Sequence, residues 1–148
     1  MDKNNDIIKL NNNHSFSNKA DNNIAIVDDD KDILELYSEY LTFNGFKVLT
    51  FDNPLELLNH LQNNTYCFSL VIADYRMPRM SGIELIQNIR KMNNHCDHKM
   101  KFILISAFLE DDVIFENKEI MSEIKIDKIL EKPVRLEELK STVIELLN

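Results

Sequence analysis

The chain has little of several residue types: its 148 residues include 2 Gly, 3 Pro, 2 Cys and no Trp. Cys67 and Cys96 lie in unrelated segments without the paired spacing of a metal site, which argues against a cysteine-bound metal. We therefore expect a globular protein with free thiols.

Positive charge is also scarce, because 17 Lys and Arg face 25 Asp and Glu and give a formal net charge of -8. No basic run occurs, and binding to a phosphate backbone requires clustered Lys and Arg, so we expect no nucleic-acid partner. No segment resembles a secretory signal, and no apolar stretch is long enough to cross a membrane. The sequence predicts a cytoplasmic protein with no membrane partner.

The N-terminal region, residues 1–22, is rich in Asn with scattered charges, and this composition predicts a disordered arm. A docking segment built on Ile7, Ile8 and Leu10 is the alternative for this region. The remaining residues, 23–148, are enough for one domain with a sizeable core, and the chain as a whole is 44% hydrophobic. We expect a single domain there, with no room for an output domain after the last helix.

From Ile24 onward, short apolar runs alternate five times with longer segments of helical period. This alternation predicts an α/β domain with a parallel sheet and crossover helices. The expected strands are 24–27, 47–51, 70–73, 101–105 and 129–130. The expected helices are 31–44 after a cap at Asp30, one starting at Pro54 and ending near Asn63, one from a cap at Ser81 to Asn93, one from about Glu110 toward Met121, and 136–147.

Polar side chains follow four of these strands at their carboxyl ends: Asp28 and Asp29, then Asp74, then Ser106, then Lys132. In an open parallel sheet these ends meet where ligands bind, so the side chains are expected to converge. Carboxylates at such a short distance from one another repel each other unless a divalent cation neutralises them. The simplest such cation with oxygen ligands is Mg²⁺. The sequence therefore predicts a magnesium site.

This set suits phosphoryl transfer to a carboxylate, which needs a nucleophile, a cation and hydrogen-bond donors. Asp74 is the candidate nucleophile. Asp29, Asp74 and the backbone carbonyl of Arg76 are expected to hold the ion, while Asp28 acts through a metal-bound water. Lys132 and Ser106 are expected to contact phosphoryl oxygens.

Each residue also has a plainer interpretation. Asp28 to Asp30 are suited to capping the first helix, Asp74 to forming a turn before Pro78, and Ser106 and Lys132 are ordinary surface types. The coincidence of four strand ends favours the site over these separate interpretations.

The motifs together closely resemble the receiver domains of two-component response regulators, the CheY-like family. IAIVDDDKDILELY is similar to the family's acidic pair and first helix, VIADYRMPRMSGIELI to its phosphorylation segment, and ILISA and EKP to the segments carrying its hydroxyl and lysine. The resemblance implies a flavodoxin-like, doubly wound five-stranded sheet of order 2-1-3-4-5 with helices on both faces. It also implies magnesium-dependent phosphotransfer from a phosphohistidine to Asp74, and a cis peptide between Lys132 and Pro133.

We accordingly expect a single-domain response regulator that promotes only its own phosphorylation and dephosphorylation and is not an enzyme acting on a separate substrate. The implied partners are a sensor histidine kinase or phosphotransfer protein and an unidentified downstream protein. A non-phosphorylated adaptor and a magnesium-dependent phosphatase are the alternatives, although Arg76 stands where such a phosphatase needs a general acid. The sequence does not reveal whether phosphorylation promotes homodimerisation. It also does not distinguish a shuttle within a phosphorelay from a terminal switch.

Overall fold

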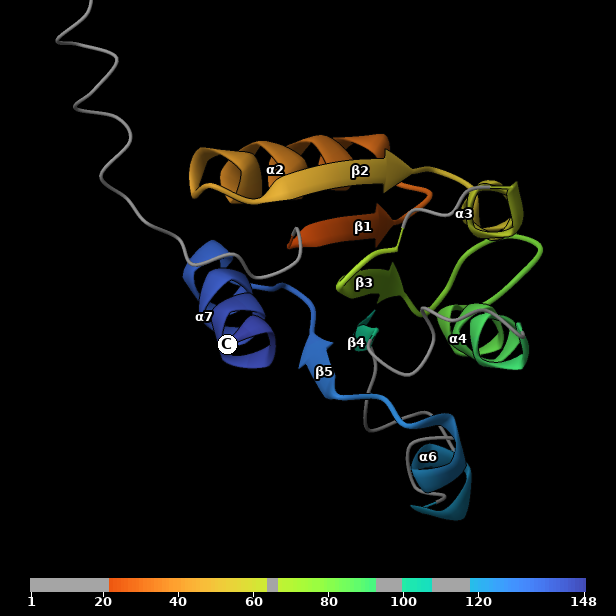
Figure 1. Cartoon of the computed structure of the whole chain (residues 1–148). Coiled ribbons are helices and arrows are strands. Elements are labelled where there is room, and N and C mark those ends of the chain that lie inside the picture. Colours follow the sequence, from red (N-terminus) through yellow and green to blue (C-terminus); the bar gives the residue numbers. More distant parts are fainter. Residues whose placement is uncertain (1–21, 64–66, 93–99, 108–117) are drawn as a thin grey trace, which may run out of the picture.

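A computed structural model of the chain describes residues 22–63, 67–92, 100–107 and 118–148. Its centre is a five-stranded parallel sheet in the order β2-β1-β3-β4-β5, with helices on both faces (Figure 1). This is the flavodoxin-like topology that the family resemblance implied. The strands are β1 (Asn23–Val27), β2 (Lys47–Phe51), β3 (Leu70–Asp74), β4 (Lys101–Ser106) and β5 (Lys128–Glu131).

The inner strands are apolar runs because helices cover both of their faces. Every residue of β1 and β3 is buried, whereas β2 at the sheet edge is largely exposed. Alternate side chains of the inner strands point to opposite faces and form two hydrophobic clusters. Because all of its strands are parallel, their carboxyl ends lie at one edge of the sheet.

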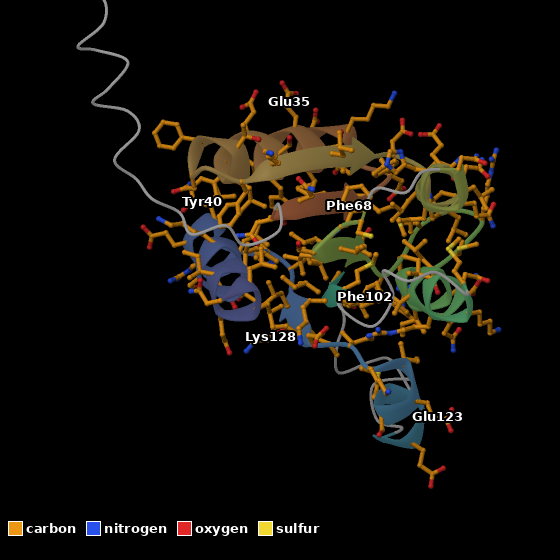
Figure 2. All side chains as sticks on the ribbon, viewed as in Figure 1. Glu35, Tyr40, Phe68, Phe102, Glu123 and Lys128 are labelled. Carbon is orange, nitrogen blue, oxygen red and sulfur yellow. The ribbon has the colours of Figure 1, made fainter. Side chains whose placement is uncertain are left out.

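The helices divide between the two faces of the sheet. On one face, α2 (Lys31–Phe43) and α7 (Leu136–Leu147) pack against Ile26, Ile72 and Ile105. On the other, α3 (Pro54–Asn63), α4 (Gly82–Lys91) and the end of α6 (Lys118–Ile124) pack around Phe102 and its neighbours. Figure 2 shows Phe68 and Phe102 inside this second layer, with Glu35 and Glu123 pointing outward.

The predicted helix starts are confirmed by their capping contacts. Asp30 accepts hydrogen bonds from the amides of Asp32 and Ile33 at the start of α2, and Ser81 accepts one from the amide of Glu84 at the start of α4. Beyond α2, Gly45 adopts a φ of 91°, which few other residues tolerate, and the chain turns into β2.

The segment before β5 differs from its prediction. The helix expected to run toward Met121 continues to Ile124, and its expected start at Glu110 lies outside the described residues. Lys125, at a φ of 56°, follows its last turn. The cis peptide implied at Lys132–Pro133 is present.

Two further expectations concern the environment of the chain. Cys67 is disulfide-bonded in the structure, so the expectation of free thiols is wrong for this residue. Among the described residues, no helix has the length and apolar character needed to cross a membrane. Residues 1–21 of the expected N-terminal arm, 1–22, lie outside the described residues, and so does the docking segment considered within it.

Gly82, the first residue of α4, joins the fold to the predicted nucleophile. A Cβ at this position would collide with the backbone oxygen of Asp74 and would lie 2.7 Å from Cδ1 of Leu104. The amide of Gly82 also donates to the carbonyl of Tyr75 at 2.8 Å. Only a residue without a side chain lets α4 start this close to the end of β3.

We predict that Gly82→Ala lowers the free energy of unfolding by about 1–3 kcal/mol, because the backbone oxygen it would strike is not free to move aside. Gln87→Ala, on the exposed side of the same helix, is the control and is expected to change stability by less than about 0.5 kcal/mol. Urea unfolding of both variants measures the effect. Equal stabilities would show that α4 shifts freely and that the approach to Asp74 is not tight.

Candidate phosphorylation site and metal centre

The carboxyl ends of four strands bring together the side chains singled out in the sequence. Asp74 is the last residue of β3 and Ser106 the last of β4, while Asp28 directly follows β1 and Lys132 directly follows β5. Because β1, β3, β4 and β5 are consecutive in the sheet, these residues share one edge. Asp28, Asp74 and Ser106 are buried, with exposures of 3%, 7% and 2%.

Lys132 bridges the acidic residues of the site. Its Nζ lies 3.1 Å from Oδ1 of Asp74 and 3.8 Å from Oδ2 of Asp28. Its backbone amide donates to the carbonyl of Ser106 at 2.8 Å, which aligns the end of β5 with the end of β4. Since both carboxylates are buried, removing this ammonium would leave two charges without their nearest counter-charge.

The three acidic residues also form a group suited to a metal ion. Asp28, Asp29 and Asp74 each offer a carboxylate oxygen, and the three oxygens lie within 4.8 Å of one another. Ligands of an octahedral Mg²⁺ lie about 3 to 4 Å apart, and this ion keeps several of its waters. The oxygens therefore fit one hydrated Mg²⁺ after small side-chain movements, with Asp29 on the exposed side of the group.

Burial and crowding raise the pKa of two of these carboxyls. Burial raises the pKa of Asp28 to about 6; a hydrogen bond from the amide of Asp30 opposes this shift, and the charge of Asp74 adds to it. Burial likewise raises the pKa of Asp74, although Lys132 opposes the rise. The pKa of Lys132 itself is lowered by burial, but Asp74 and Asp28 outweigh this effect and leave it above its ordinary value. The site thus carries acidic charge that Lys132 alone does not neutralise.

The interpretation of Asp28 to Asp30 as helix-capping residues is correct for one of the three. Asp30 caps α2, whereas Asp28 points to Lys132 and Asp29 joins the carboxylate group. Arg76 has an exposed side chain. Its backbone carbonyl as a metal ligand remains a prediction, as do the catalytic roles of Asp74, Ser106 and Lys132.

Two residues near this site were assigned no role from the sequence. Tyr37 was expected only in the core, yet the charges of Lys132, Asp28 and Asp74 all influence its phenol, whose pKa is raised chiefly by burial. The sequence feature that could have pointed to Tyr37 was its hydroxyl, which stands among the apolar positions of α2. Gly82 is the second residue that was assigned no role. The sequence feature that could have pointed to it was its place directly after the capping residue Ser81.

The raised pKa of Asp28 predicts how stability changes with pH when no metal is present. A carboxyl whose folded pKa exceeds its unfolded value stabilises the folded state only while it is protonated, so stability falls as the pH rises from about 4 to about 6. Asp28→Asn removes this loss. Urea unfolding in EDTA should show the variant more stable than wild type by up to about 3 kcal/mol at about pH 8, and no more stable at about pH 4.

Asp52→Asn makes the same change of charge at a carboxylate whose side chain is 42% exposed, and it serves as the control. Its difference from wild type should stay small at both pH values. An Asp28→Asn variant that is less stable than wild type at about pH 8 would mean that the contact with Lys132 outweighs burial.

Comparisons with known proteins agree with this geometry. Over 71 residues, 48% of the chain, the sequence is 41% identical to the transcriptional regulatory protein CpxR homolog of Haemophilus influenzae and covers 30% of that protein. Over 137 residues, 90% of the chain, it is 30% identical to the cyclic di-GMP phosphodiesterase response regulator RpfG of Xanthomonas campestris and covers 34% of it. The chain thus spans about a third of the length of these two relatives.

Among solved structures, a CheY-like response regulator receiver domain protein from Methanospirillum hungatei superposes with a TM-score of 0.72 at 28% identity. This match covers 86% of the present chain and 94% of the other. The response regulator receiver domain family matches residues 24–144, which include every residue of the site. The chain therefore belongs to the family of response regulator receiver domains.

Proposed function

We propose that this receiver acts as a single-domain response regulator that accepts a phosphoryl group from a phosphohistidine on Asp74 in a magnesium-dependent reaction. The observation that carries the proposal is the placement of Lys132 Nζ between the carboxylates of Asp74 and Asp28. A cation there neutralises charge on the nucleophile and on an incoming phosphoryl group.

The transfer breaks the P–N bond of a phosphohistidine whose other ring nitrogen is protonated, and it forms a P–O bond to a carboxylate oxygen of Asp74. The electron pair of the broken bond stays on the ring nitrogen, so the products are an acyl phosphate and a neutral imidazole. Asp28, Asp29, Asp74 and the carbonyl of Arg76 would hold Mg²⁺, which supplies positive charge for the phosphoryl oxygens. Lys132 contacts another of these oxygens, and the hydroxyl of Ser106 donates to a third. A cavity of about 420 Å³ lies beside the β3–α4 connection that follows Asp74, and its lining includes Arg76, Arg79 and Met80.

The added charge on Asp74 draws Ser106 and Lys132 toward it and favours one of two conformations. Because these residues end β4 and precede α7, the change reaches the surface formed by α6, β5 and α7, where a downstream protein binds. The domain promotes only its own phosphorylation and dephosphorylation. The predicted partners are a sensor histidine kinase or phosphotransfer protein and a downstream target.

We also propose that the protein lies in the cytoplasm, as predicted from the sequence, and that residues 23–148 form the receiver domain after the N-terminal arm. The disulfide at Cys67 is unusual for a cytoplasmic protein, because disulfides are rare in the cytosol.

Intact-mass spectrometry after incubation with acetyl phosphate tests the transfer. Wild-type protein is expected to gain one phosphoryl group with Mg²⁺ and none in EDTA, because the acidic group then lacks its cation. Asp74→Asn is expected to gain none, since it removes the nucleophile. Asp52→Asn, which changes the same charge outside the site, should label like wild type.

Other outcomes identify the alternatives. A wild-type protein that stays unlabelled with Mg²⁺ and with phosphorylated kinase would be a non-phosphorylated adaptor. Repeated turnover of a small phosphate ester, abolished by Asp74→Asn, would instead indicate a phosphatase.

A further inference from the structure

The C-terminal end of α6 is fixed by a buried residue and by backbone contacts, although other residues of this helix are exposed. Figure 1 shows α6 below α4 and β5, at the lower end of the molecule. Ile124, its last residue, is 3% exposed and belongs to the core, and Ile126 packs against the same cluster. Ser122 and Glu123, the two residues directly before Ile124, are exposed.

Arg90, in the last turn of α4, holds this end through backbone contacts. Its Nη2 donates to the carbonyl of Lys125 at 2.8 Å, and its Nε donates to the carbonyl of Ile124 at 3.4 Å. The last carbonyls of a helix lack partners within the helix and carry partial negative charge, so a guanidinium is well suited to them.

The same guanidinium lies over the ring of Phe102, with its central carbon 4.5 Å from the ring centroid. Phe102 is in turn tied to the residues after α6. Its amide donates to Oδ2 of Asp127 at 2.8 Å, and its carbonyl accepts from the amide of Asp127 at 3.0 Å. Arg90 therefore joins α4, the end of α6 and β4, the strand that ends on Ser106.

We propose that Arg90 is a positioning residue that fixes the C-terminal end of α6, so that α6 responds to phosphorylation by rotating about Lys125. This inference rests on the proposed function. In chain order α6 is the next described element after β4, so in this proposal the N-terminal end of α6 is the end that responds to Ser106. The opposite end is held by Arg90, Phe102 and Asp127, and a helix pulled at one end and fixed at the other pivots.

Hydrogen–deuterium exchange tests the fixed end in the ligand-free protein. The amides of Lys125 and Asp127 are hydrogen-bonded to the carbonyls of Met121 and Phe102. Arg90→Met, which keeps an apolar stem and removes the charge and donors, should make these amides exchange at least about tenfold faster. Arg90→Lys, which keeps the charge but not the paired donors, should give an intermediate effect. Lys91→Met, at the exposed neighbouring position, should change nothing.

The pivot is tested by adding beryllofluoride, a phosphoryl analogue, together with Mg²⁺. In wild type, the ligand should alter exchange across residues 118–123 and leave Lys125 and Asp127 unchanged. In Arg90→Met, the ligand-induced change should extend through residue 127, which a merely stabilising role for Arg90 does not predict.

Unchanged exchange of Lys125 and Asp127 in ligand-free Arg90→Met would overturn the anchoring role. Ligand-induced changes of equal size at both ends of wild-type α6 would overturn the pivot. Failure of beryllofluoride to alter any part of wild type would overturn the proposed function and the pivot with it, while the ligand-free exchange still decides whether Arg90 anchors α6.

Discussion

Among the described residues, the carboxyl edge of the sheet carries more carboxylate charge than the nearby Lys132 neutralises, and the candidate site depends on this excess. Asp28 and Asp74 are buried side by side at the ends of β1 and β3, and Lys132 Nζ contacts both. Burial raises the pKa of both carboxyls even with this contact. Such an arrangement costs folding free energy, and it favours binding of a cation and a chemical change at the site.

Most of the fold follows from local patterns in the sequence. The apolar runs that form β1 and β3 are buried on both faces, and the caps at Asp30 and Ser81 set the starts of α2 and α4. The convergence of Asp28, Asp74, Ser106 and Lys132 was predictable because parallel strands bring their carboxyl ends to one edge. These features depend on rules that act within one element or between neighbouring strands.

What the sequence did not reveal depends on contacts between distant elements. Gly82 is required because α4 approaches Asp74 and Leu104, and this closeness appears only when the layers are packed. Arg90 reaches carbonyls 34 and 35 residues away, and a single arginine in a helix gives no sign of such partners. Cys67 was expected as a free thiol because spacing in the sequence does not report which cysteines come together.

β4 links the site to the end of α6, which belongs to the surface that the site is proposed to control. Ser106 ends this strand beside Asp74, and Phe102, four residues earlier, lies under the guanidinium of Arg90 and pairs with Asp127. β4, buried from Phe102 to Ser106, thus connects the candidate site to the anchored end of α6.

Calorimetric titration with Mg²⁺ at about pH 8 tests most directly whether the three acidic residues act as one cation site. The account predicts a single bound ion in wild type and at least about tenfold weaker binding in Asp29→Asn, because one of three oxygen ligands is lost. Asp52→Asn should bind like wild type. Equal Mg²⁺ affinity in wild type and Asp29→Asn, or no binding to either, would contradict it.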